Sequence, residues 1–291
     1  MVLSWLFFAF ASAALISIFT IVEKKSLLKE HAMKFATVLA LFNALLSFFY
    51  ISKVDFSISP KFIFIIFLLA IINAVAFLLM AKAIRHMEIS VSTPILNFGP
   101  AITAMFAFLF LGESIGLSQI GGILLLIAGV YIVEVDHDWT NLKNPLVKML
   151  HSKYIHFLFF SMALYAIGTV ADKYVLNQGV DKFTLLFFAH IFIAIIYIIF
   201  ISAYYNGASD IVSGIRESGK YIFVIAVLMS LSRIFYLEAI SLAMVSLVIP
   251  IRRLSTLFVT FFGGNFFHEN GLKIKIIGCC ITLLGVALIV L

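Results

Sequence analysis

Long apolar runs, separated by short polar connections, dominate the hydrophobic pattern of this chain. Each run is about 20 residues long, enough for one helix to cross about 30 Å of hydrocarbon. The pattern predicts ten transmembrane helices, at residues 3–22, 35–51, 62–84, 91–111, 117–133, 154–175, 183–204, 221–240, 245–263 and 272–291. Because a backbone in lipid must satisfy its own hydrogen bonds, we expect an all-α integral membrane protein.

A repeat relates the two halves of the chain. A constant shift of 156 residues pairs positions that stand out from the apolar background: Pro94 with Pro250, Glu113 with Glu269, Gly122 with Gly278, and Gly129 with Gly285. Each half contains five predicted helices, an odd number, so the second half enters the membrane from the opposite side. We therefore expect two inverted five-helix repeats, at residues 1–134 and 154–291, with a connecting loop at residues 135–153.

The beginnings of the two halves also match, at a shift of 149 residues. The segment Thr20-Ile-Val-Glu23-Lys24 is similar to Thr169-Val-Ala-Asp172-Lys173. With Ala83-Ile84, Pro94 and the paired glycine segments at 112–130 and 269–286, these motifs resemble the drug/metabolite transporter superfamily, specifically its EamA-type family. The resemblance covers essentially the whole chain. It implies a secondary transporter of small metabolites, with a central cavity lined mainly by helices 1, 3, 4, 6, 8 and 9.

Composition supports the membrane assignment. Hydrophobic residues make up 64% of the chain and charged residues only 12%, against roughly 25% charged in a soluble domain. The net charge of +6 comes from Lys and Arg residues scattered at helix ends, which build no basic face for nucleic acid. We expect the partners to be the lipid bilayer and a small-molecule substrate, in the cell (inner) membrane, with the oligomeric state open.

Motifs for catalysis are absent from the sequence. It contains no Gly-rich phosphate loop, no His-Glu-x-x-His and no Gly-x-Ser-x-Gly. Its two cysteines, Cys279 and Cys280, are neighbours within one predicted helix and are interpreted as packing residues. We therefore expect no enzyme activity, no cofactor and no metal.

Three arginines lie inside predicted helices. Arg233 falls in the eighth helix, and Arg252 with Arg253 in the ninth. A charge at a helix centre costs about 2.5 to 3.5 kcal/mol on insertion scales, so these arginines require partners, water or a ligand. Adjacent helical residues point about 100° apart, so we expect Arg253, rather than both residues of the pair, to face the cavity.

The charge of the ninth helix belongs to one half only. The repeat pairs Arg252 with Leu96 and Arg253 with Asn97. A guanidinium fork suits carboxylate or phosphate, which predicts an anionic substrate. The basic pair also resembles one that sugar-phosphate and nucleotide-sugar members of the superfamily carry at a similar place. Alternatively, these arginines bind backbone carbonyls or Glu238, or extend to the membrane surface.

Acid–base pairs close the first and sixth predicted helices. These pairs, Glu23-Lys24 and Asp172-Lys173, lie at opposite membrane faces in an inverted repeat. They are candidates for gating or coupling, and ordinary interfacial anchoring is the alternative. Glu113 and Glu269 lie in the turns that lead into the fifth and tenth helices. A carboxylate there is stabilised by the positive N-terminus of the helix, as a capping group, and proton coupling is the alternative.

Other polar and small residues complete the candidate set. Asn73 and Asn97 are candidate polar contacts for the substrate, with hydrogen bonding between helices as the alternative. His190 can carry protons or serve as a hydrogen-bonded helix histidine. Pro94 and Pro250 are expected to bend helices beside the cavity, and the paired glycines to allow close helix packing.

Three functions remain open at this point. The leading hypothesis is a secondary transporter of small polar metabolites by alternating access, with an anionic substrate. An exporter of cationic or amphipathic compounds or amino acids is the first alternative, for which the motivating residues are Glu23 and Glu238. Translocation of a lipid-phosphate carrier, with its headgroup on the arginines, is the second.

Loop charges and family resemblance disagree on orientation. The connections after odd-numbered helices contain thirteen Lys and Arg residues and those after even-numbered helices four. By the positive-inside rule both termini lie outside. Better-known members of the family are thought to keep both termini inside.

Overall fold

Helices account for the regular structure of the described part of the chain. The computed structural model describes residues 2–99, 101–102, 105, 116–134, 151–243, 248 and 251–290. The first half contains α1 (Val2–Leu27), α2 (Ala32–Ser47), η1 (Phe48–Lys53), α3 (Pro60–His86), α4 (Ile89–Ile95), η2 (Leu96–Phe98) and α6 (Leu117–Glu134). The second half contains α8 (Lys153–Asn177), α9 (Lys182–Tyr204), α10 (Ala208–Leu242), α12 (Ser255–Phe258), η3 (Val259–Gly263), α13 (Gly264–Phe266) and α14 (Leu272–Val290).

Seven helices within these described ranges are long and apolar enough to cross a membrane. They correspond to the predicted helices 1, 2, 3, 6, 7, 8 and 10. The fifth predicted helix is present as α6, which is shorter. Parts of the fourth and ninth lie outside the described residues, as do Glu113 and Pro250. The hydrophobic pattern therefore predicted a multi-pass membrane protein correctly.

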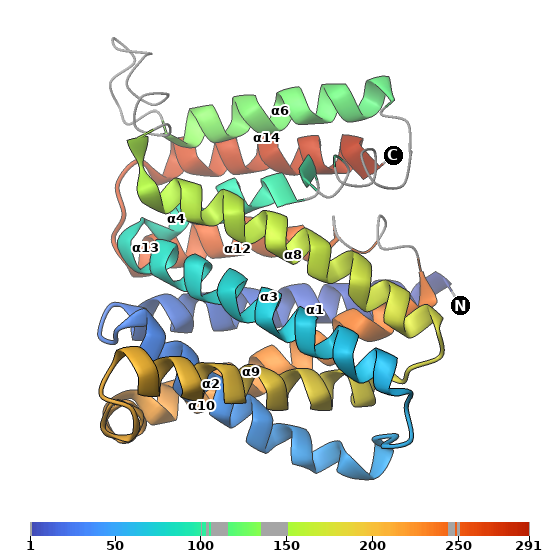
Figure 1. The fold of residues 1–291 in the computed structure, drawn as a ribbon. Coiled ribbons are helices and arrows are strands. Elements are labelled where there is room, and N and C mark those ends of the chain that lie inside the picture. The colour runs from blue at the N-terminus through green and yellow to red at the C-terminus, as the bar shows by residue number, and fades with distance from the viewer. Residues whose placement is uncertain are drawn as a thin grey trace.

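Helices from the two halves pack against each other in the bundle. In Figure 1, α6 and α14 lie side by side at one edge, and α2, α9 and α10 lie at the opposite edge. Between these edges α1 packs on α10, and α3 packs on α8. The largest apolar core surrounds α2, where Phe35 and Val38 pack with residues of α3, α9 and α10. The start of α1 and the end of α14 lie at the same end of the bundle.

Glycines let α6 and α14 approach closely. A Cβ atom on Gly122 would lie 2.6 Å from the carbonyl oxygen of Gly285, and one on Gly129 would lie 2.7 Å from that of Gly278. Likewise, a Cβ atom on Gly278 would lie 2.7 Å from the carbonyl oxygen of Gly129, and one on Gly285 would lie 2.7 Å from that of Gly122. The close-packing prediction for these four glycines is therefore confirmed.

The helix α10 begins well before the predicted start at residue 221. Its first residues, from Ala208, include Asp210, Arg216 and Glu217, so hydropathy alone did not mark them as part of a span. They form an exposed polar helical extension. Gly214, which has no side chain, lets this extension pack closely against Lys34 and Val38 of α2. Helical geometry thus continues beyond the apolar segment.

The fourth and ninth predicted helices are irregular where they are described. Pro94 lies inside α4, and the chain changes to a 3₁₀ turn, η2, directly after it. Because proline lacks an amide hydrogen, Pro94 cannot donate to the carbonyl of Ser90, so the α-helical hydrogen bonding is interrupted within α4. In the ninth, α12 is followed by the π-helical turn η3 and then by α13. Such π-turns occur frequently at functional sites.

Candidate functional site

A cavity of about 370 Å³ lies between the two halves of the bundle. Side chains of α1, α2, α3, α8, α9 and α10 form its wall, together with Leu96 of η2, Gly99 and residues 252, 253 and 255. Spans 1, 3, 4, 6, 8 and 9, which the resemblance implied, all contribute. The second and seventh spans, α2 and α9, also contribute, and they pack against each other.

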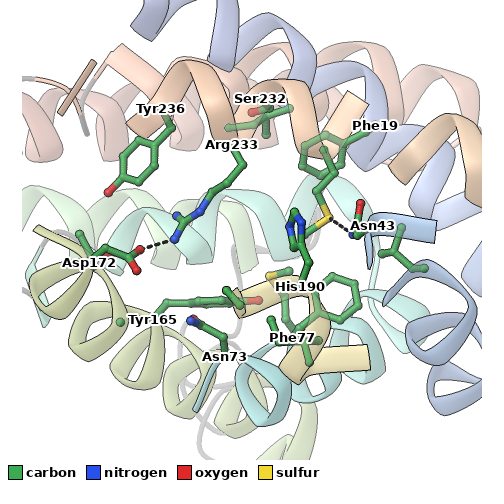
Figure 2. Close-up of a pocket in the computed structure, with 18 of the residues that line it drawn as sticks. Phe19, Asn43, Asn73, Phe77, Tyr165, Asp172, His190, Ser232, Arg233 and Tyr236 are labelled. Atoms are coloured by element: carbon green, nitrogen blue, oxygen red, sulfur yellow. Dashed lines mark hydrogen bonds and ion pairs between the residues drawn. The ribbon is translucent and has the colours of Figure 1, made fainter. Parts of the chain in front are cut away.

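An ion pair crosses one side of this cavity. Arg233 of α10 projects into the cavity and pairs with the carboxylate of Asp172 on α8, as Figure 2 shows. The Asp172 side chain is 5% exposed, and that of Arg233 is 30% exposed. Since removing either charge from water is costly, the pair is stable only while both members are present. This arginine therefore carries little uncompensated charge.

The other two arginines differ from Arg233. Arg252 and Arg253 both line the cavity, and within the described ranges no carboxylate lies at ion-pair distance from either. The expectation that only Arg253 faces the cavity was wrong. Leu254 interrupts the helix directly after them, and the side chain of Arg252 lies along the ring of Tyr236.

Tyr236 of α10 organises two of the guanidinium groups. The guanidinium carbon of Arg252 lies 4.1 Å from the centre of its ring, and that of Arg233 lies 5.2 Å from it. Cation–π contacts of this kind hold each cation in a fixed direction. The Nε atom of Arg252 has no hydrogen-bond partner among the described residues. Arg253 occupies the space beside Gly99, where a Cβ atom would lie 2.5 Å from its terminal nitrogen.

Lys24 and Lys173 bind helix ends. Lys24 donates hydrogen bonds to the carbonyl oxygens of Ile84 and Met87, each at 2.5 Å, and Lys173 donates to that of Ile240 at 2.5 Å. These carbonyls lie at or beside the C-terminal ends of α3 and α10, where cations are favoured. Neither lysine contributes to the cavity wall.

Glu23 and Asp172 both line the cavity but have different surroundings. Glu23 is 1% exposed, and its Oε1 atom has no hydrogen-bond partner in the described part of the chain. Asp172 has the guanidinium of Arg233. The two acids at matching positions of the repeat therefore differ in whether their charge is compensated.

The two predicted asparagines and Glu238 are separated by the fold. Asn73 of α3 lines the cavity, where its Oδ1 atom would lie 3.0 Å from a Cβ atom on Gly168. Asn97 does not contribute to the cavity wall. It is buried and donates to the hydroxyls of Thr256 at 3.2 Å and Thr282 at 2.8 Å. Glu238 also lies outside the wall, paired with Lys182 of α9.

Sequence reasoning overlooked several residues of the cavity wall. Asn43 of α2 accepts a hydrogen bond from the hydroxyl of Ser230 at 3.0 Å, and Tyr165 of α8 lies across the cavity from Arg233 (Figure 2). Asn43 lies in the middle of an apolar run, a signal that could have identified it. His190 also lines the cavity and lies 3.3 Å from the hydroxyl of Tyr50, as expected for a hydrogen-bonded helix histidine.

Contacts between the halves link the start of α4 to the residues around the start of α14. The carboxylate of Glu269 accepts hydrogen bonds from the backbone amides of Ile89 at 2.6 Å and Ser90 at 2.9 Å, at the start of α4. Lys275 of α14 pairs with Glu88, directly before α4. Glu269 thus acts as a helix cap, but the helix that it caps is α4 of the other half, where the sequence predicted the tenth helix.

Comparison with known proteins agrees with this architecture. The model of the EamA-like transporter family matches residues 3–135 and 152–291. An uncharacterized protein of Methanocaldococcus jannaschii is 32% identical over 68 residues, which are 23% of this chain and 50% of that protein, so the match spans about half of this curated relative. A solved structure, described only as the crystal structure of a protein, is similar in fold. Its TM-score is 0.63 and its sequence identity 11%, over 98% of this chain and 96% of that chain. The chain belongs to the EamA-like transporter family.

Proposed function

We propose that this membrane transporter carries small anionic metabolites, with phosphate or carboxylate groups, by alternating access. The observation that supports this most directly is the pair Arg252 and Arg253 on the cavity wall, without a carboxylate partner among the described residues. Two uncompensated guanidinium groups in a region of low dielectric favour an anion strongly. In this proposal Arg253 and Arg252 bind the anion.

The remaining charges of the cavity shape this preference. Arg233 is already neutralised by Asp172, and Glu23 is the other acid on the wall. With all of these groups ionised, one positive charge remains in excess on the wall. Asn73 supplies a neutral polar contact for an uncharged part of the same substrate. The volume of about 370 Å³ suits a small metabolite.

We further propose ten spanning helices in two inverted repeats, at residues 1–134 and 154–291, with a connecting loop at 135–153. The packing of α1 on α10 and of α8 on α3 supports this, because exchanging the halves converts one contact into the other. The cavity lies where the halves meet, as in other inverted-repeat transporters. In this arrangement Lys24 and Lys173 hold the C-terminal ends of α3 and α10 in place, each by a hydrogen bond within its own half.

The first alternative, an exporter of cations, has one observation in its favour. Glu23 on the cavity wall is an acid without a cationic partner in the described part of the chain. Its second motivating residue, Glu238, lies outside the wall and is paired with Lys182. The anionic substrate is therefore the better supported.

A thermal-shift screen of the purified protein tests the proposal. Matched panels of anionic, zwitterionic and cationic metabolites are compared on the wild type and on Arg253→Gln. A ligand at 100 times its dissociation constant stabilises the folded state by about 2.7 kcal/mol, so even a weak ligand registers at millimolar concentration. We expect phosphates or carboxylates to raise the transition temperature of the wild type and not of the variant.

Arg216→Gln is the matched control for this screen. Arg216 is exposed on the polar extension of α10 that begins at Ala208, and it does not contribute to the cavity wall. It should retain the whole response to anions. Stabilisation by cations alone, unchanged in Arg253→Gln, would reject the anionic substrate. A response confined to phospholipid headgroups would favour the lipid-phosphate alternative.

A further inference from the structure

The cavity wall carries one acid, Glu23, for which the described residues supply no counter-ion. Glu23 is 1% exposed and lines the cavity, and its Oε1 atom lacks a hydrogen-bond partner in the described ranges. Lys24, its neighbour in sequence, is directed to the carbonyl oxygens of Ile84 and Met87 instead. Within the described residues Glu23 therefore has no counter-ion, and its Oε1 atom lacks the hydrogen bond that a buried carboxylate oxygen requires.

The repeat explains why the counter-ion is missing. Glu23 matches Asp172 at the shift of 149 residues, and Asp172 is paired with Arg233. At the shift of 156 residues, Arg233 matches Phe77 of α3, which also lines the cavity. The same position thus holds a guanidinium in the second half and a phenyl ring in the first. One acid of the matching pair is neutralised and the other is not.

Other titratable or charged groups face the same cavity from neighbouring helices. Those without a role in the Asp172 ion pair are Tyr165, His190, Tyr197, Tyr236, Arg252 and Arg253. The tyrosines carry phenol groups and the two arginines are cations, so none of these residues adds a second carboxyl without a partner. His190 lies beside the hydroxyl of Tyr50. Glu23 is therefore the wall carboxyl for which gaining a proton removes an uncompensated charge.

We propose that Glu23 is a proton-binding site of the transport cavity. A proton from the water that reaches the cavity forms an O–H bond with the carboxylate, and the neutral acid needs no counter-ion. Protonation also raises the excess positive charge on the wall from one to two, which strengthens anion binding at Arg252 and Arg253. By reciprocity, a bound anion raises proton affinity, so proton and anion occupy the cavity together. This coupling rests on the proposed function, whereas the proton site itself does not.

Infrared difference spectroscopy on the lipid-reconstituted protein tests the site with protons as the only ligand. The C=O stretch of a protonated carboxyl is resolved from the bands of a carboxylate, and it is followed during a pH titration. We expect a protonated carboxyl band in the wild type that disappears as the pH rises, and its absence from Glu23→Gln. Glu30→Gln is the matched control, because Glu30 is also buried but is partnered by Lys34 at 3.1 Å and by the hydroxyl of Ser218 at 2.8 Å.

A second variant tests the cause. Phe77→Arg places a guanidinium where the second half carries Arg233, and we expect it to abolish the titrating band by giving Glu23 a counter-ion. Persistence of the wild-type band in Glu23→Gln, or its loss in Glu30→Gln, would overturn the proposal, as would a wild type without such a band. Because this titration needs no substrate, a negative thermal-shift screen would reject the anionic substrate and leave the proton site standing.

Discussion

Lys24 and Lys173 make the same contact in the two halves of the chain. Each ammonium group donates a hydrogen bond to a main-chain carbonyl oxygen, Ile84 for the first lysine and Ile240 for the second, at 2.5 Å in both cases. The two lysines are related by the shift of 149 residues and the two isoleucines by the shift of 156. The matching contacts favour anchoring of a helix end within each half over a direct contact between the halves.

Loss of either lysine should therefore destabilise the protein. Lys24→Gln and Lys173→Gln each remove a charged hydrogen bond to a carbonyl, and we expect each to lower the free energy of unfolding by about 1.5 to 3 kcal/mol. Thermal denaturation in detergent measures this. Lys53→Gln, at an exposed position, is the control. Unchanged stability combined with altered transport in both variants would instead support direct gates.

Removal of Arg233 should expose the charge of Asp172. Breaking a buried pair from one side costs about 3 to 5 kcal/mol, so Arg233→Gln should be strongly destabilised. Adding Asp172→Asn to this variant should recover much of the loss, because no unpaired charge then remains. A double-mutant cycle on thermal stability measures the coupling. Additive effects of the two substitutions would contradict the ion pair.

Neighbouring glycines on α6 should respond differently to alanine. A methyl group on Gly122 would meet the carbonyl oxygen of Gly285 at 2.6 Å, whereas nothing lies within 4 Å of one on Gly121. We expect Gly122→Ala to cost about 1 to 3 kcal/mol through overpacking. Gly121→Ala should be neutral or stabilising by up to about 1 kcal/mol, because alanine favours the helix. Equal effects in thermal denaturation would show that α6 and α14 do not meet at this point.

Glu269 should contribute to stability through the other half of the chain. Its carboxylate accepts hydrogen bonds from the backbone amides of Ile89 and Ser90 at the start of α4, so Glu269→Ala removes the acceptor of both. We expect a loss of about 0.5 to 2 kcal/mol, as for other helix caps. Glu217→Ala, at a side chain that is 61% exposed, serves as the control in the same denaturation experiment. Identical stability of the two variants would exclude the cap.

Hydropathy predicted most of the helices because a membrane segment must be long, apolar and internally hydrogen-bonded. The same signal placed the start of α10 too late in the sequence, since an exposed helical extension such as the one containing Arg216 need not be apolar. The repeat predicted that α6 and α14 have glycines for close helix packing, at Gly122 on the first and Gly278 on the second, because small residues at matched positions have few other uses in an apolar helix.

The candidate site was only partly predictable. Charges deep in apolar runs identified Arg233, Arg252 and Arg253, and all three line the cavity. Nothing in the spacing indicated that Arg233 and Arg252 both contact the ring of Tyr236, since this depends on how the helices cross. Asn97 had the same sequence signal as Asn73, but the fold directs it to two threonine hydroxyls instead.

The most direct test of the anionic substrate is the current that a concentration jump of each metabolite evokes from proteoliposomes on a solid-supported membrane. Wild type, Arg253→Gln and the control Arg216→Gln are compared. An anionic substrate predicts saturable currents with phosphates or carboxylates that Arg253→Gln abolishes and Arg216→Gln retains. Currents evoked only by cations, or anion currents that survive in Arg253→Gln, would contradict it.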